Sequence, residues 1–148
     1  MKKWISTILL AAWVAMILFL SFQNGSDTAN TSMTFTAKIL RLFTGSEPDY
    51  EMLVFWDGRF RLAAHFVLLF LYGLISFETV YQWTNRSRTK GLAISMVSGI
   101  LIGIVAEVGK LPIEGRHCDL WEMMLNVIGA AIGSLVILGI RRLVEKRV

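Results

Sequence analysis

The 148-residue sequence has little of what stabilises most soluble or secreted domains. Its single cysteine, Cys118, excludes an internal disulfide, and two prolines without any low-complexity tract argue against long disordered segments. Charged residues make up 18% of the chain, below the roughly 25% of typical soluble domains. Hydrophobic residues make up 55%, and the mean hydropathy is +0.58. A lipid bilayer is therefore the expected solvent, and residues 1–148 are predicted to form a single membrane domain.

Features that would indicate nucleic acid, a metal or a cofactor are also scarce. The net charge of +4 and the pI near 9.5 would suggest nucleic acid only if the cations formed a patch. They lie instead between apolar runs, so we expect no nucleic-acid partner. His117 and Cys118 in "RHCD" fall short of the four ligands of a structural zinc site, and Cys118 is interpreted as an incidental thiol. No metal and no cofactor are predicted.

Four apolar runs are long enough to cross a bilayer, whose hydrocarbon core needs about 20 helical residues. The first run follows Lys2 and Lys3 and resembles a signal peptide. It is longer than a usual signal core, and no A-x-A cleavage site follows, so we expect an uncleaved helix. The sequence thus predicts an all-α, four-transmembrane-helix bundle. The predicted spans are residues 4–20, 62–81, 92–108 and 120–140.

The cations are divided unevenly between the two sides of the predicted membrane. Nine of the fifteen share the side of both termini: Lys2, Lys3, Arg86, Arg88, Lys90, Arg141, Arg142, Lys146 and Arg147. The other side carries six cations and nine of the eleven acids. Because cytoplasmic loops are enriched in Lys and Arg, both termini are predicted to be cytoplasmic.

The segment between the first two spans, residues 21–59, predicts a short amphipathic helix between residues 32 and 43. Ser32 is its expected N-cap and Gly45 its expected stop. Such a helix would lie on the membrane surface or pack on the spans, and the sequence leaves both open. Residues 49–56, "DYEMLVFW", predict a second interfacial turn.

Small residues recur every fourth position in the last two spans. They are Ser95, Gly99 and Gly103 in the third, and Gly129 and Gly133 in the fourth. Such faces let helix backbones approach closely, so the third and fourth spans are predicted to be the most tightly packed pair.

Polar residues gather at the non-cytoplasmic end of all four spans. Arg61 and His65 share a helix face, and Glu122 and Asn126 lie one to two turns inside the fourth apolar run. Ionisable groups at that depth are costly unless paired and are candidates for function. The predicted ligand-binding set is Gln23, Arg61, His65, Glu107, Lys110, Arg116, Asp119, Glu122 and Asn126. A purely structural alternative pairs Arg61 with Asp119 or Glu122, and Glu107 with Lys110 or Arg116.

These blocks resemble the VanZ-like family of small bacterial membrane proteins. The first, "SFQNGSDTANTS", matches at Ser21, Gln23, Thr28 and Ser32; the second, "RLAAHF", matches at Arg61 and His65. The third keeps the register of Glu107, Arg116, Glu122, Asn126, Gly129 and Gly133. The chain departs from the pattern at Leu62, where a basic residue is usual, at Ala106 for Asp, at Lys110 for Gln, at Asp119 for a small hydroxyl, and at Glu122 for Asp.

The resemblance implies a multi-pass protein of the bacterial cytoplasmic membrane. Some members of the family are linked to resistance to teicoplanin and related lipoglycopeptides, and no agreed reaction comes with the resemblance. The departures at Ala106 and Lys110 weaken any shared chemistry that would use an Asp–Glu pair.

Three functions remain open, of which the first, non-catalytic one is favoured. In it, Arg61, Lys110 and Arg116 hold the phosphate or carboxylate of a lipid-linked envelope precursor or a glycopeptide, and Gln23 and Asn126 add hydrogen bonds. In the second, His65 is the acid or base of an enzyme acting on a lipid headgroup, with Glu107 or Glu122 orienting it or joining it in holding a divalent cation. In the third, the protein is a scaffold for a partner membrane protein.

Overall fold

The computed structural model describes residues 2–145, and these form five α-helices and no strand. The helices are α1 (Lys2–Ser21), α2 (Gly25–Thr44), α3 (Tyr50–Trp83), α4 (Arg88–Val108) and α5 (Leu120–Glu145). Four of them, α1, α3, α4 and α5, are long and apolar enough to cross a membrane. The predicted all-α architecture with four spans is therefore confirmed. Lys146 and Arg147, used in predicting the topology, lie outside the described residues.

The helix between the first two spans is longer than predicted. It begins at Gly25, because the Asn24 side chain accepts a hydrogen bond from the backbone N–H of Asp27. Ser32 is thus an interior residue of α2 and not its N-cap, and its hydroxyl donates to Asp57 of α3. The predicted stop is confirmed: Gly45 has φ of 72°, and its N–H donates to the carbonyl of Arg41.

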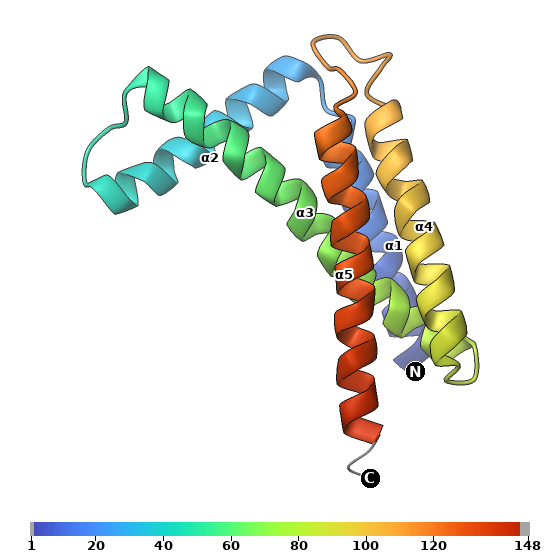
Figure 1. Ribbon diagram of the computed structural model, residues 1–148. Helices are drawn as coiled ribbons and strands as arrows, with labels where there is room; N and C mark the ends of the chain where they lie inside the picture. Colours follow the sequence, from blue (N-terminus) through green and yellow to red (C-terminus); the bar gives the residue numbers. More distant parts are fainter. Residues whose placement is uncertain (1, 146–148) are drawn as a thin grey trace.

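The second span begins a dozen residues earlier than predicted. Asp49 caps α3 by accepting from the N–H of Met52, so residues 49–56 start this helix and do not form a separate turn. At 1.5 Å per residue, its 34 residues extend over about 50 Å, well beyond a hydrocarbon core of about 30 Å. Figure 1 shows α2 and the first part of α3 leaving the bundle together as an arm.

The most extensive helix contact joins α3 and α5, and not the predicted pair α4 and α5. Gly99 of α4 does face α5, where an added Cβ would lie 2.6 Å from the Cβ of Ala130. Gly129 and Gly133, however, face α3: an added Cβ would collide with the carbonyl oxygens of Phe66 and Phe70 respectively. The two stripes of small residues therefore serve different neighbours, and α5 packs between α3 and α4.

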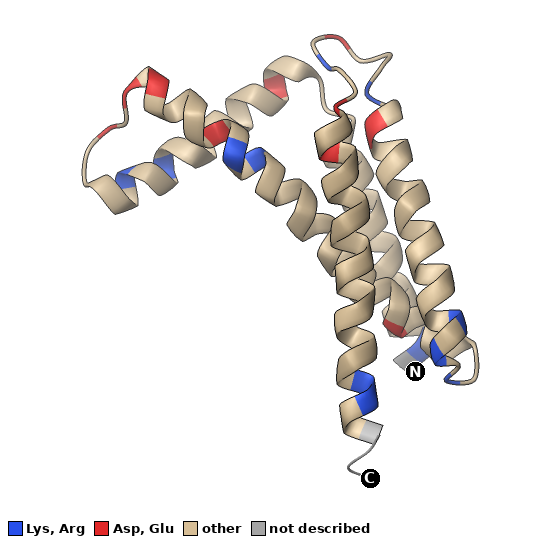
Figure 2. Cartoon of the chain, in the orientation of Figure 1, with Lys and Arg blue, Asp and Glu red and all other residues tan. Residues whose placement is uncertain are grey.

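The two ends of the bundle differ in charge. The start of α1 and the end of α5 lie at one end, together with the basic residues that open α4 and close α5 (Figures 1 and 2). The opposite end, here the loop end, carries the connection between α4 and α5, residues 109–119. Between the two ends of the bundle lies an apolar core of Ile17, Leu69, Tyr72, Ala106 and Ala130. The candidate site lies at the loop end of this core.

Candidate functional site

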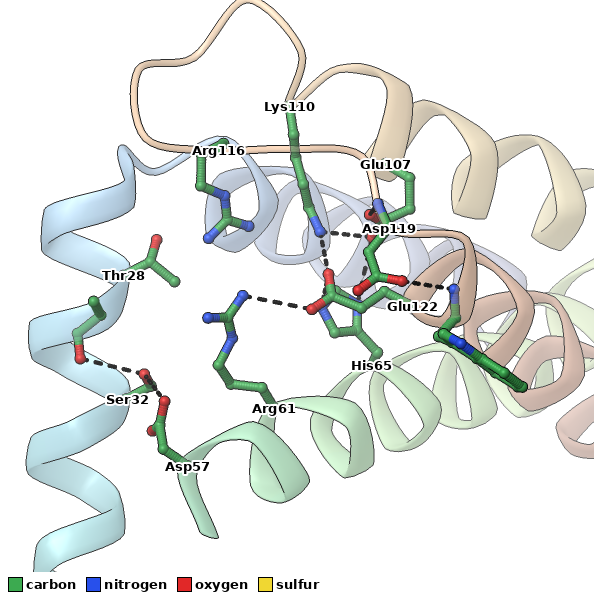
Figure 3. Close-up of polar contacts among 12 residues, drawn as sticks. Thr28, Ser32, Asp57, Arg61, His65, Glu107, Lys110, Arg116, Asp119 and Glu122 are labelled. Atoms are coloured by element: carbon green, nitrogen blue, oxygen red, sulfur yellow. Dashed lines mark hydrogen bonds and ion pairs between the residues drawn. The ribbon is translucent and has the colours of Figure 1, made fainter. Parts of the chain in front are cut away.

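Three helices bring the polar residues together at the loop end (Figure 3). Arg61 and His65 lie one turn apart on α3, and Glu122 and Asn126 one turn apart on α5. Glu107 lies in the last turn of α4. Lys110 follows in a tight turn, in which its backbone N–H donates to the Glu107 carbonyl. The i, i+4 spacing on two helices and the sharp end of a third thus aim their side chains at one point.

The centre of the cluster is a buried ammonium between two carboxylates. Lys110 Nζ lies 2.7 Å from Glu107 Oε1 and 2.6 Å from Glu122 Oε2. The side chains of Lys110, Glu107 and Glu122 are only 1%, 0% and 9% exposed. Burying a charge costs several kcal/mol unless a partner compensates it, and here one cation serves two anions.

His65 completes this group, and both its ring nitrogens face acceptors. Nε2 lies 3.0 Å from Glu122 Oε2, and Nδ1 lies 3.2 Å from Asn126 Oδ1. The Asn126 amide nitrogen donates to Glu107 Oε1, so its oxygen is the atom left to accept from the ring. The ring is therefore held between the Glu122 carboxylate and the Asn126 amide, while Lys110 supplies the positive charge between the two carboxylates. We call Glu107, Lys110, Glu122, His65 and Asn126 the ionic centre.

The ionic centre has the ligand types of a metal site. One donor atom each from His65, Glu107 and Glu122 lies within 4.8 Å of the others, and imidazole with carboxylates suits zinc. The Lys110 ammonium, however, lies between the two carboxylates and donates to both. A metal ion would have to displace Lys110, so the chain itself supplies the cation of this centre.

Arg61 and Arg116 lie beside the ionic centre and are held more loosely. Arg61 Nη2 is 3.4 Å from Glu122 Oε1, with 35% of the Arg61 side chain exposed. Arg116, in the 109–119 connection, donates to the carbonyl of Ser21 over 3.4 Å. Partial burial, and then the charge of Arg61, lower the pKa of the Arg116 guanidinium below its usual value. An anion between the two guanidinium groups would relieve this repulsion.

The two arginines border a cavity of about 500 Å³ among α1, α2 and α3, here the bundle cavity. Most of its wall is apolar, as at Ile17, Leu20, Phe35 and Leu68. Arg61, His65, Arg116 and Asn126 supply polar groups, and all four matched residues of the first family block also line it: Ser21, Gln23, Thr28 and Ser32. Ala106 lies here too, so the departure from Asp leaves this wall without a carboxylate.

A second cavity of about 580 Å³ lies on another side of Arg61, here the mouth cavity. It is lined by Phe55, Gly58, Arg59, Arg61, Leu62, His117, Asp119 and Glu122. A small cavity of about 50 Å³, lined by Arg61, Lys110 and Arg116 among others, adjoins the ionic centre. Arg61 borders all three cavities and so lies where they meet.

Most of the residues predicted as a site therefore converge. Arg61 pairs with Glu122, and Glu107 with Lys110, as the structural alternative had it. Asp119 differs from its neighbours: its carboxylate caps α5 by accepting from the N–H of Trp121 over 2.7 Å. Its backbone N–H, at 3.4 Å, is what reaches Glu107.

Sequence reasoning missed Asp57, one turn before Arg61 on α3. Its side chain is buried and accepts hydrogen bonds from Ser32 over 3.1 Å and from Thr36 over 3.0 Å. These bonds join α2 to α3 and fix the wall of the bundle cavity. The available signal was the i, i+4 spacing to Arg61, which places an acid on the face that carries the site.

The fold and the site define a multi-pass helical membrane protein with a charged cluster at one end of its bundle. Residues 6–142 match the sequence profile of the VanZ/LLP1 family, and the chain belongs to this family. Comparison with curated proteins and with solved structures gave no match.

Proposed function

We propose that this VanZ/LLP1 protein acts at the extracytoplasmic face of a bacterial cytoplasmic membrane, where it binds a lipid-linked envelope precursor by its anionic headgroup. By doing so it lowers the access of teicoplanin and related lipoglycopeptides to their target. The observation that carries the proposal is the bundle cavity, an apolar space with two loosely held arginines at its polar border.

The orientation is supported by the distribution of charge. The end of the bundle that holds the start of α1 also holds the basic start of α4 and the basic end of α5 (Figure 2). By the positive-inside tendency, we expect that end in the cytoplasm and the ionic centre outside. A reporter domain fused after Val148 should be cytoplasmic, and an extracytoplasmic reporter would reverse the topology.

The chemistry of the cavity suits a lipid phosphate better than a soluble anion. A guanidinium offers five donors and binds phosphate oxygens in pairs, so Arg61 and Arg116 together can hold a phosphate between them. The apolar wall formed by α1, α2 and α3 then accommodates hydrocarbon chains next to that phosphate. A soluble anion would leave this wall uncovered.

The proposal is tested on two levels with one pair of variants. Arg116→Gln removes a cavity cation, whereas Arg41→Gln removes an equal charge from a 67% exposed ion pair with Glu47 on the arm. Purified protein should retain an anionic lipid in native mass spectrometry, and a sensitive host should gain teicoplanin tolerance. Arg116→Gln should lose both and Arg41→Gln neither. Failure to bind any anionic lipid would refute the proposal.

A second candidate, an enzyme acting on a lipid headgroup, is favoured by the approach of His65, Glu107 and Glu122. Against it, both ring nitrogens of His65 are already in contact with groups of the chain, Nε2 with Glu122 and Nδ1 with Asn126. Turnover of a lipid diphosphate by purified protein, lost in His65→Gln, would establish the enzyme. Binding without turnover supports the first function.

A further inference from the structure

The mouth cavity is not explained by a lipid phosphate alone. Its volume of about 580 Å³ lies within the roughly 300–1,000 Å³ typical of ligand sites. It shares Arg61 with the bundle cavity, so a ligand phosphate bound at Arg61 has open space on both sides. A lipid that ended at its phosphate would fill the bundle cavity and leave the mouth cavity empty.

The lining of the mouth cavity mixes donors, acceptors and an aromatic ring. Arg59 supplies a donor, the Asp119 carboxylate supplies an acceptor, and Phe55 offers its ring. Glu122 adds negative charge to the wall, but both its oxygens already contact cationic or imidazole groups of the chain. Arg59 is held in place, since its guanidinium lies 3.4 Å from the centroid of the Phe55 ring and donates to the Phe55 carbonyl. Because the wall carries both signs of charge, an anion is repelled by its carboxylates and a cation is repelled by its arginines. Hydroxyl groups, which donate and accept, match it fully.

We infer that the ligand is a lipid phosphodiester or diphosphate that carries a hydroxyl-rich, sugar-like headgroup. Its chains lie in the bundle cavity, its phosphate lies at Arg61 and Arg116, and its headgroup occupies the mouth cavity. This inference rests on the proposed function and specifies the class of lipid.

Gly58 offers a way to close the mouth cavity without touching a charged group. It lines the mouth cavity, and a Cβ added to it would meet nothing within 4 Å. A side chain can therefore begin at this position without a clash at Cβ, and Gly58→Phe adds a large ring to the lining of the mouth cavity. Gly139 of α5 is a matched control, because an added Cβ there also meets nothing within 4 Å and it lines none of the three cavities.

The experiment compares two lipids with the same dioleoyl chains on the full-length protein in detergent, by native mass spectrometry titration. Phosphatidylinositol carries a ring of hydroxyl groups, whereas phosphatidic acid ends at its phosphate. We expect the unaltered protein to bind phosphatidylinositol at least tenfold more tightly, although phosphatidic acid has the higher charge. Gly58→Phe should remove this preference and leave phosphatidic acid binding unchanged, and Gly139→Phe should change neither.

The outcomes separate the two proposals. If both lipids bind equally well and Gly58→Phe changes nothing, the sugar-like headgroup is refuted while the anionic lipid site stands. If neither lipid binds, the proposed function is refuted, and this inference, which rests on it, is refuted too. A preference for phosphatidylinositol that survives Gly58→Phe places the headgroup outside the mouth cavity and overturns the inference.

Discussion

The ionic centre and the arginine pair lie side by side but are built differently. In the centre, Lys110 lies 2.6–2.7 Å from two nearly buried carboxylates, so each of these charges has a close opposite partner, although the Asn126–Glu107 hydrogen bond is 3.4 Å long. Arg61 and Arg116 make contacts of 3.4 Å, repel each other and border cavities. The charges of the ionic centre have their partners within the chain and hold the helix ends together. Arg61 and Arg116 keep spare hydrogen-bond donors beside a cavity, where a ligand can reach them. This difference supports the proposal that the first group has a structural role and the second binds the ligand.

The largest effect is expected from removing the cation of the ionic centre. Lys110→Met leaves two buried carboxylates without their shared ammonium, which should cost about 3–5 kcal/mol of stability. The apparent Tm in detergent should fall by on the order of 10 °C. Lys38→Met, on the exposed surface of α2, should leave it unchanged.

The same variant tests the latent metal site. With Lys110 gone, His65, Glu107 and Glu122 are free to take Zn²⁺, which should restore part of the lost Tm. The unaltered protein should show no such shift. A Lys110→Met protein as stable as the parent would remove the central difference between the two groups.

A second, smaller loss of stability should follow from separating α3 and α5. These two helices carry residues of both the ionic centre and the arginine pair. The added methyl of Gly133→Ala collides with the Phe70 carbonyl, and overpacking of this kind costs about 1–3 kcal/mol. Gly139→Ala meets no atom within 4 Å and should keep the parent Tm. If Gly133→Ala were also neutral, the α3–α5 contact would not be the one that positions the site.

How far the sequence predicts this site depends on the kind of signal. The length of the apolar runs was enough to predict the four spans. The charges at their ends offered Arg61–Glu122 and Glu107–Lys110 only as two of several possible pairs, with Asp119 and Arg116 as the other partners. A stripe of small residues marks a close contact but does not name the partner, so Gly129 and Gly133 were assigned to the wrong helix.

The arm was less predictable, because its helix boundaries depend on competing caps. Asn24 and Ser32 are both acceptable N-caps by residue type, and only the contact with Asp57 shows that Ser32 has another role. The contacts of Asp57 could not be predicted because its partners are 25 and 21 residues away in sequence. The i, i+4 spacing to Arg61 was the local signal, and it indicates a shared helix face but not a partner on α2.

A third prediction sharpens the comparison by altering binding without altering stability. Arg61→Gln removes the charge that borders all three cavities, and its ion pair with Glu122 is long and partly exposed. We expect at least tenfold weaker binding of phosphatidic acid, measured by native mass spectrometry, with a nearly unchanged apparent Tm. A Tm loss as large as that of Lys110→Met would place Arg61 in the structural group.

The smallest effect is expected at the junction of the arm and the bundle. Asp57→Asn keeps the size of the side chain but replaces one of two accepting oxygens, at a cost of about 1 kcal/mol. Because Ser32 also lines the bundle cavity, phosphatidic acid binding should weaken two- to threefold. Asp27→Asn on the same arm provides the control, since the hydrogen bond at the start of α2 uses the Asp27 backbone.

The central claim is tested most directly by mapping the position of a bound anionic lipid on the protein. Full-length protein in bilayers is photolabelled with phosphatidic acid that carries a diazirine on one acyl chain, and the labelled residues are mapped by mass spectrometry. We predict labels on the bundle-cavity walls, at Leu20, Phe35 and Leu68, that an excess of unlabelled phosphatidic acid removes and that are missing in Arg116→Gln. Labels confined to the lipid-facing sides of α4 and α5, and equal in Arg116→Gln, would contradict the account.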